Sequence, residues 1–350
     1  MSVQRWKQRP PGSNWGDFGA DDQVGRMNFL TPEKVMEGVA EVHEGLSFCL
    51  SLPLDYPGGC GMNPNRHPPM LRPTLRKGKV NFNCLLGELE PGRTDVLNDD
   101  LAILHLQYST QWDGLAHVGG LFDADGDGVA EPVYYNGYSA RDFMQAPLDT
   151  KDCGVLDRDS LKSSSSAKAL GIQGLAERCV QTRGVMLDLK AHYGTARTLI
   201  GYEELMRALE ADSMELTQGD ILCLHTGFAE RVLGMDKHPD HDALSNYGAV
   251  FNGRDKRLLQ WISDSGIAAI AADNYAVEAF PAPDGGACCA ALPLHEHCLF
   301  KLGLHLGELW RLTPLADALR ARSRYRFLLT APPLNLPGAI ASPLTPIGTL

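Results

Sequence analysis

Long apolar runs are missing from this sequence of 350 residues, and none approaches the ~18 residues that a membrane-spanning helix requires. Residues 1–19 are polar and lack the apolar stretch of a signal peptide. Positive charge is also scarce, because 43 acidic residues outnumber 32 basic ones and leave a net charge of −11. Nucleic acids and anionic lipid surfaces attract basic proteins, so neither is an expected partner. The sequence therefore predicts a cytoplasmic protein with no membrane and no nucleic-acid partner.

Cysteine is scattered along the chain without a metal-binding pattern. The nine cysteines include no CxxC motif, and the only close pair is Cys288 and Cys289, which are adjacent in the sequence. A structural zinc knuckle is therefore not expected. Internal repeats, a nucleophile elbow, a P-loop and a dinucleotide-binding fingerprint are missing as well.

Apolar residues are plentiful enough for a large core, since 44% of the chain is hydrophobic and 21% is charged. Apolar runs predict strands over residues 102–107, 184–189, 219–225 and 267–272. Helical periodicity predicts helices over residues 202–211 and 256–265, and Thr31-Pro32-Glu33 predicts the start of a helix that runs to about His43. Strands thus alternate with helices between irregular ends, which indicates a mixed α/β fold.

The predicted organisation has two parts. Residues 1–45 form an N-terminal arm and a helix, and residues 46–350 form a single catalytic domain. Proline and glycine are frequent between Ser47 and Val80, which predicts loops over the surface or around a pocket.

The segment from Gln107 to His117 concentrates polar chemistry directly after a predicted strand, where loops present functional groups. Asp113 and His117 are four residues apart, so they would share one face of a helical turn. A carboxylate can bind a cation, and an imidazole can accept a proton near neutral pH. Spacing alone also allows a turn-capping aspartate and a packed histidine.

A second group of such residues lies near the C-terminus. His295, Glu296 and His297 follow one another, with His305 and Glu308 shortly after them. These side chains could supply metal ligands, although the pattern is not the HExxH helix of metalloproteases. This second group indicates a metal site only when it is considered together with the segment from Gln107 to His117.

Two other features have plain structural interpretations. Residues 123–128 resemble a calcium loop, but the twelfth position, which needs a bidentate carboxylate, is Tyr134. A solvated turn rich in aspartate and glycine explains this segment better. His225 ends a predicted strand, where a satisfied, half-buried histidine and a functional one are equally consistent with the sequence.

Taken together and in this order, the two clusters resemble the cyclase family of metal-dependent hydrolases, which contains kynurenine formamidase and isatin hydrolase. The family motif HxGTHxDxxxH is matched by Thr110, Asp113 and His117, and its distal His and Glu by His295 and Glu308. The longer members of the family are also similar at residues 22–32, 224–227, 273–278 and 333–338. In the motif, Gln107 and Gln111 replace two histidines and Ser109 replaces the glycine, so this chain carries a Gln-Trp-Asp variant.

The resemblance implies the family's swivelling β/β/α domain and a hydrolase with a small, cyclic or aromatic substrate. It implies one divalent metal ion bound by Asp113, His295 and Glu308, with Gln111 assisting. Catalysis would fall to His117 as acid and base, with Asp113 and Glu308. The bond opened would be the C–N bond of an amide or lactam, or the ester of a lactone. Suggested substrate contacts are Trp112, Tyr134, Tyr135 and His225.

Loss of two imidazole ligands makes the expected site richer in oxygen, which favours manganese over zinc. A homo-oligomer, either a dimer or a tetramer, is expected. Two alternatives remain open from sequence. One is a metal-free cyclase or dehydratase of the same fold, and the other is a binding protein that kept the fold without catalysis.

Overall fold

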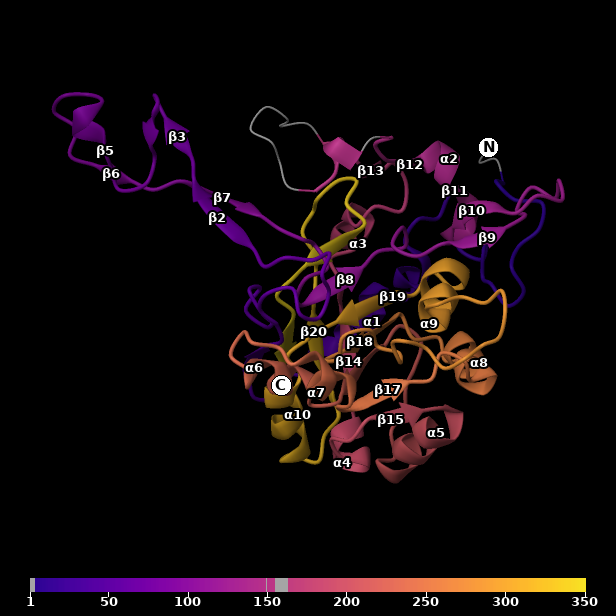
Figure 1. Ribbon diagram of the computed structural model, residues 1–350. Helices are drawn as coiled ribbons and strands as arrows, with labels where there is room; N and C mark the ends of the chain where they lie inside the picture. The colour runs from indigo at the N-terminus through magenta and orange to yellow at the C-terminus, as the bar shows by residue number, and fades with distance from the viewer. Residues whose placement is uncertain (1–3, 149, 155–162) are drawn as a thin grey trace.

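One mixed sheet of nine strands forms the centre of the molecule (Figure 1). The computed structural model describes residues 4–148, 150–154 and 163–350. The strand order is β1-β22-β20-β14-β16-β18-β19-β8-β21, and β14, β16, β18 and β19 run parallel to one another. In chain order, these strands are β1 (Ser47–Cys49), β8 (Gln111–Asp113), β14 (Gln181–Asp188), β16 (Ile221–His225), β18 (Ala269–Ala272), β19 (His305–Glu308), β20 (Arg326–Thr330), β21 (Ala341–Pro343) and β22 (Ile347–Thr349). The predicted mixed α/β fold is confirmed.

The central parallel strands are apolar on both faces. Along β14, Val185 and Leu187 enter one hydrophobic cluster, while Met186 between them enters the cluster on the other side. Side chains alternate between the faces of a strand, so a nearly continuous apolar run fits a strand that is covered on both sides. These runs made β14, β16 and β18 predictable from the sequence.

Helices cover the sheet and join its parallel strands. They are α1 (Pro32–Val39), α2 (Ala140–Phe143), α3 (Gln173–Glu177), α4 (Leu189–Tyr193), α5 (Tyr202–Ala211), α6 (Phe228–Leu233), α7 (His241–Ser245), α8 (Lys256–Asp264), α9 (Pro293–His295) and α10 (Thr313–Arg320). The Thr31 hydroxyl accepts a hydrogen bond from the Lys34 amide, which is the expected N-cap, although α1 ends at Val39 and not near His43. Helix α1 packs on β14, where a Cβ at Gly38 would lie 2.8 Å from the Thr182 backbone. Only glycine permits this close approach.

Short turns complete the helical structure. The 3₁₀ turns are η1 (Gly25–Phe29), η2 (Leu86–Glu88), η3 (Tyr135–Gly137) and η4 (Thr150–Asp152), and η5 (Glu296–Lys301) is a wider π-helical turn directly after α9. In the part of the chain that the structure describes, no helix combines the length and apolarity that a bilayer crossing requires.

The N-terminal segment lies against the rest of the chain. A small sheet of β9 (Gly120–Phe122), β10 (Glu131–Tyr134) and β11 (Tyr138–Ser139) borders it. The indole of Trp15 is buried, donates to the carbonyl of Phe300 at 2.8 Å and meets the Trp6 ring edge-on. The division of the chain into an arm and helix over residues 1–45 and one catalytic domain over residues 46–350 stays a prediction.

Residues 70–103 form an arm that projects from the body (Figure 1). It consists of three antiparallel strand pairs, and its apolar side chains at Leu71, Phe82 and Leu101 are exposed. The strands are β2 (Met70–Pro73), β3 (Leu75–Arg76), β4 (Lys79–Val80), β5 (Cys84–Leu85), β6 (Val96–Leu97) and β7 (Asp100–Ile103). The strand predicted over residues 102–107 is wrong in its bounds, because the observed strand ends at Ile103 inside this arm. Four further short strands form two pairs elsewhere. β12 (Met144–Gln145) pairs with β13 (Ser166–Ala167), and β15 (Thr198–Ile200) pairs with β17 (Ala249–Phe251).

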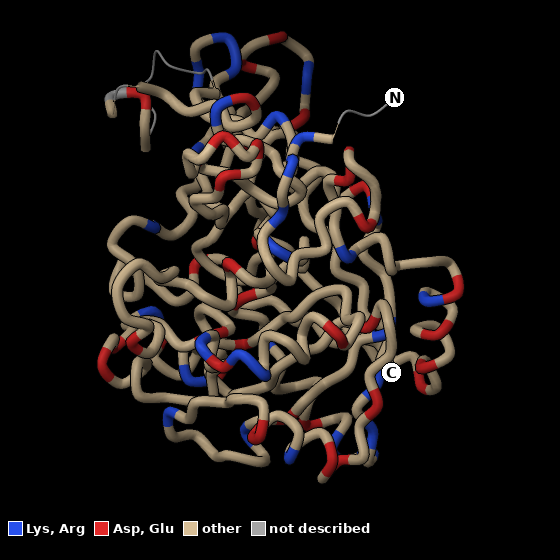
Figure 2. Tube along the Cα trace, turned by 90° about the vertical axis from the view of Figure 1, so that its right-hand side faces the viewer, with Lys and Arg blue, Asp and Glu red and all other residues tan. Residues whose placement is uncertain are grey.

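Charged residues of both signs alternate along the described chain and do not separate into an acidic and a basic face (Figure 2). The absence of a nucleic-acid partner stays a prediction from the sequence.

Candidate metal centre

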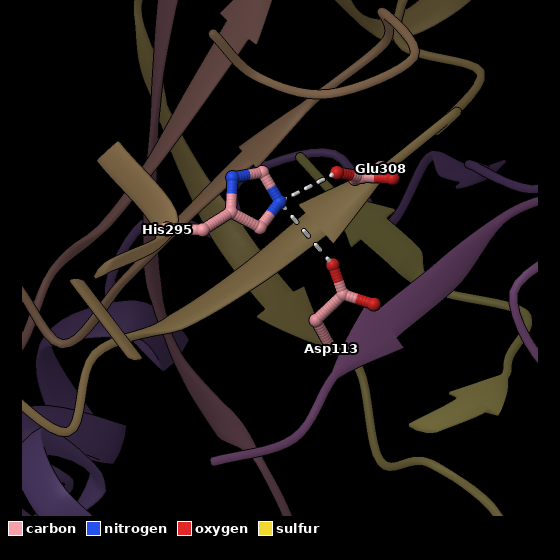
Figure 3. Close-up of side chains that lie close together, drawn as sticks. All are labelled: Asp113, His295 and Glu308. Carbon is pink, nitrogen blue, oxygen red and sulfur yellow. Dashed lines mark hydrogen bonds and ion pairs between the residues drawn. The ribbon is translucent and has the colours of Figure 1, made fainter. Parts of the chain in front are cut away.

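Three side chains from distant parts of the sequence meet in the interior (Figure 3). They are Asp113 at the end of β8, His295 at the end of α9 and Glu308 at the end of β19, and one ligand atom of each lies within 4.8 Å of the others. The imidazole Nε2 of His295 lies 3.2 Å from Glu308 Oε1 and 3.8 Å from Asp113 Oδ2. All three residues are buried, so the cluster brings two carboxylates and one imidazole together out of bulk solvent.

The pairing of β8 with β19 explains why these carboxylates face one another. Gln111 pairs with Glu308 and Asp113 pairs with Leu306 in antiparallel register. Since successive side chains point to opposite faces, Gln111, Asp113 and Glu308 share one face. Trp112 points to the other face, where its ring lies 4.9 Å from that of Trp310 at a steep angle.

His295 is fixed in position by a carboxylate that the sequence analysis did not identify. Glu278 Oε1 lies 2.7 Å from His295 Nδ1, and the same carboxylate accepts hydrogen bonds from the backbone amides of Leu294 and His295. An imidazole that donates from Nδ1 presents an unprotonated Nε2, which is the form that binds a metal. Glu278 therefore orients Nε2 of His295 toward Asp113 and Glu308.

The proximity of buried charged groups shifts the pKa values of Glu308 and His295. Burial and the nearby charge of Asp113 raise the pKa of Glu308, while hydrogen bonding to His295 opposes this effect. Burial would lower the pKa of His295, but hydrogen bonds to Glu278 and Glu308 outweigh it and raise that pKa. Two neighbouring buried carboxylates repel one another, and a cation between them would remove that repulsion.

Two buried oxygens in and beside this cluster lack hydrogen-bond partners among the described residues. Asp113 Oδ2 and Gln111 Oε1 have none, although a buried polar atom is normally paired. An acceptor without a donor is what a cation site requires, so the Asp113, His295 and Glu308 donor set fits a divalent ion. The Gln111 amide nitrogen donates to both carboxylates, at 3.1 Å to Asp113 and 3.0 Å to Glu308. Because nitrogen of an amide does not bind cations, Gln111 could be a ligand only after its amide turned over.

His117 borders the same cluster from the turn after β8. Its Nε2 lies 3.9 Å from Asp113 Oδ1, and its Nδ1 lies 3.3 Å from the side-chain nitrogen of Gln107. Burial lowers the pKa of His117, although the charge of Asp113 opposes the shift. The imidazole is therefore neutral at pH 7 and able to accept a proton.

A pocket of about 320 Å³ opens onto the cluster. His117, His295 and Glu308 are exposed to it, and Met62, Tyr275, Phe280 and Leu292 contribute apolar or aromatic wall, together with the polar side chains of Asn63, Asn65 and Arg66. Its size lies near the lower end of the ~300–1,000 Å³ typical of small-molecule sites. The cluster is thus accessible to a small molecule.

All four suggested substrate contacts lie outside this pocket. Trp112 is fully buried, and its indole donates to the Ala331 carbonyl on the face of the sheet opposite Asp113. Tyr135 is fully buried and donates to Asp22 at 3.1 Å. Tyr134 lines a different cavity, beside Leu106 and Ala116. The apolar character that suggested these residues serves packing here.

His225, the fourth, is buried in a separate polar group at the ends of the parallel strands. Its Nδ1 lies 2.8 Å from Asp188 and its Nε2 lies 3.0 Å from the Thr313 hydroxyl. Burial opposes protonation of His225, but Asp188 and Asp273 outweigh it and raise the pKa of the imidazole. Both ring nitrogens are occupied by partners, and the residue does not line the pocket at Asp113.

Other members of the sequence clusters are also accounted for. His297 bonds to Ser263, and His305 Nδ1 lies 3.0 Å from the Asp113 carbonyl, so neither is placed among the three ligand residues. Asp123, Asp125 and Asp127 also have oxygens close together, yet these carboxylates accept hydrogen bonds from the backbone of their own exposed turn. That arrangement matches the solvated turn expected from the sequence.

The family model described as "Putative cyclase" matches residues 91–279, which is more than half of the chain. The chain therefore belongs to the cyclase family. Its fold is similar to the crystal structure of a cyclase that is 29% identical, with a TM-score of 0.72 and coverage of 98% of this chain and 100% of that one.

More distant structures share the fold. Isatin hydrolase A from Labrenzia aggregata is 12% identical, with a TM-score of 0.54 and coverage of 90% of this chain and 97% of that chain. Isatin hydrolase A from Ralstonia solanacearum is 13% identical, with a TM-score of 0.54 and coverage of 91% and 98%. A comparison with curated protein sequences gives no match.

Proposed function

We propose that this protein is a metal-dependent hydrolase that opens an amide, lactam or lactone bond of a small cyclic or aromatic substrate. The observation that carries the proposal is the buried Asp113, His295 and Glu308 cluster, of which His295 and Glu308 line a pocket. Asp113 Oδ2 has no hydrogen-bond partner among the described residues. Family membership and the fold shared with isatin hydrolases support the same class of reaction.

A divalent cation, when bound by Asp113, His295 and Glu308, supplies Lewis-acid polarisation of the scissile carbonyl and lowers the pKa of nearby water. The donor set holds two carboxylate oxygens and one imidazole nitrogen, which favours manganese over zinc. Glu278 accepts from Nδ1 of His295 and so directs Nε2 of the same ring at the site.

His117 carries the proton in this proposal. Its neutral imidazole takes a proton from the attacking water and returns it to the departing nitrogen or oxygen. The Gln107 side-chain nitrogen lies 3.3 Å from Nδ1 of His117. If that amide turned over, its oxygen would accept from a protonated Nδ1 and leave Nε2 as the proton acceptor. Asp113, next to that nitrogen, stabilises the imidazolium that forms.

The proposal is tested with one probe of each bond class, namely isatin, formanilide and dihydrocoumarin. We expect hydrolysis of at least one probe, loss of that activity after dialysis against a chelator, and better recovery with Mn²⁺ than with Zn²⁺. Full activity in protein shown by elemental analysis to be free of metal would establish the metal-free mechanism instead. If no probe is turned over and no divalent ion binds, the binding-protein alternative stands.

A further inference from the structure

Arg66 is a cation that lines the pocket of the candidate site. It lines the pocket that holds His117, His295 and Glu308, and its side chain is partly buried. Among the described residues, its only side-chain hydrogen bond goes from one guanidinium nitrogen to the Gln107 carbonyl, at 2.6 Å. No ion pair within that part of the chain joins Arg66 to a carboxylate. Most of its donors are therefore available to a ligand.

The turn that carries Arg66 is held in place. The Arg66 amide donates to the Asn63 carbonyl at 3.1 Å, and the Asn63 side chain donates to the Tyr275 hydroxyl at 3.0 Å. Tyr275 follows the central strand β18, so the turn is fixed to the same scaffold that carries the cluster. The Gln107 residue that accepts from Arg66 also contacts His117, which places the guanidinium one residue away from the proposed base.

Arg66 could instead balance the charge of the buried acids. A divalent cation would balance the two charges of Asp113 and Glu308, and Arg66 would then line the pocket without an ion-pair partner among the described residues. In a chain with a net charge of −11, such a placement favours an anionic ligand. A planar guanidinium matches a carboxylate with two parallel hydrogen bonds.

We propose that the substrate is a small organic anion whose carboxylate, separate from the scissile bond, pairs with Arg66. Met62, Phe280 and Leu292, which line the same pocket, then contact the apolar body of that molecule. This inference rests on the proposed hydrolase function and narrows its substrate class.

Binding measurements test the inference without relying on turnover. The probes are benzoate, phenylacetate and anthranilate, each compared with its uncharged amide by titration calorimetry. The protein is used after equilibration with Mn²⁺ and again after chelation. In chelated protein, Asp113 and Glu308 repel the carboxylate of a probe. A probe acid that binds more tightly than its amide under these conditions therefore indicates an attraction to Arg66.

We expect at least one acid to bind about tenfold or more tightly than its amide in both states, and added salt to weaken the preference. In chelated protein the Arg66→Gln variant should lose the preference for the acid over its amide, and the Arg66→Lys variant should keep part of that preference. Arg72→Gln, an exposed arginine on the projecting arm, is the matched control and should bind like the natural protein. Thermal unfolding checks that each variant folds.

Equal binding of acid and amide in every pair, including no binding of either, overturns the inference. So does a preference that Arg66→Gln retains in chelated protein. The hydrolase proposal fails separately, through absence of metal binding and of turnover. If Arg66→Gln changes the affinity for Mn²⁺ and leaves ligand selectivity unchanged, Arg66 only balances the charge of the cluster.

Discussion

Individual side chains determine the proposed chemistry, and the proposed acid/base role of His117 can be tested directly. His117→Ala and Asp113→Asn should each lower turnover by about 100-fold or more, because the first removes the acid/base group and the second weakens the cation site. Steady-state kinetics on a responding probe measure this effect. Asp113→Asn should also lower the metal content.

The His297→Ala variant provides a matched control, since His297 bonds to Ser263 and does not line the pocket. It should alter stability more than turnover. Near-normal turnover in folded His117→Ala protein would exclude His117 as the acid/base group.

Glu278 should control metal affinity through His295. Replacing it by glutamine removes the charge that holds Nδ1–H, and an outer partner of this kind is worth about 10- to 100-fold in affinity. We expect Glu278→Gln to weaken Mn²⁺ binding by that factor, as measured by calorimetry. Glu296→Gln, a neighbouring acid next to His295 in the sequence, should bind Mn²⁺ normally. Equal affinities of the two variants would show that Glu278 has no positioning role.

The sequence identified the residues of the cluster better than their surroundings. Asp113, His295 and Glu308 could be predicted as one site because the family motif names them, and the structure brings them together. Glu278 and Arg66 lie 17 residues before His295 and 47 before Asp113, so no local spacing links them to the ligands. Trp112 was suggested as a substrate contact, whereas strand alternation turns it to the face opposite Asp113.

At the scale of elements, the Asp188 and His225 pair joins the ends of β14 and β16. Burial alone would raise the pKa of Asp188, but hydrogen bonds from His225 and Arg320 lower it well below its usual range. Asp188→Asn removes the carboxylate that bonds to buried His225 and leaves Asp273 as its remaining nearby charge. This loss should destabilise the fold by about 3 kcal/mol. Urea unfolding monitored by circular dichroism measures this loss.

The loss should depend on pH in a defined way. The pKa of Asp188 is lowered on folding, so its contribution is complete above the unfolded value of about 3.9 and is lost as the pH falls. The pKa of His225 is raised, so its contribution is complete below about 6.5 and is lost as the pH rises through the folded value. The difference between the two proteins should thus be largest between about pH 4 and 6.5. A difference that is constant from pH 3 to pH 9 would contradict this account.

Elements in the core were predictable because both faces of the central strands are apolar, and α5 spans residues 202–211 as expected. The arm at residues 70–103 was not predicted, since its strands are two to four residues long and have no buried face to impose a period. Proline and glycine there indicated loops, and the paired backbone became apparent only in the structure.

At the scale of the whole molecule, the homo-oligomer stays a prediction. Sedimentation velocity of the full chain should give two or four times the mass of one chain. A monomer at micromolar concentration would contradict it. In Figure 1 the arm of residues 70–103 projects away from strands β8 and β19, which carry Asp113 and Glu308.

The central claim is that one divalent cation binds between β8, α9 and β19. Anomalous diffraction at the manganese edge, from crystals grown with Mn²⁺, locates such an ion directly. We predict one peak at about 2.0–2.4 Å from ligand atoms of Asp113, His295 and Glu308. A map without a peak among these three residues, from protein that hydrolyses its substrate at full rate, would contradict the account.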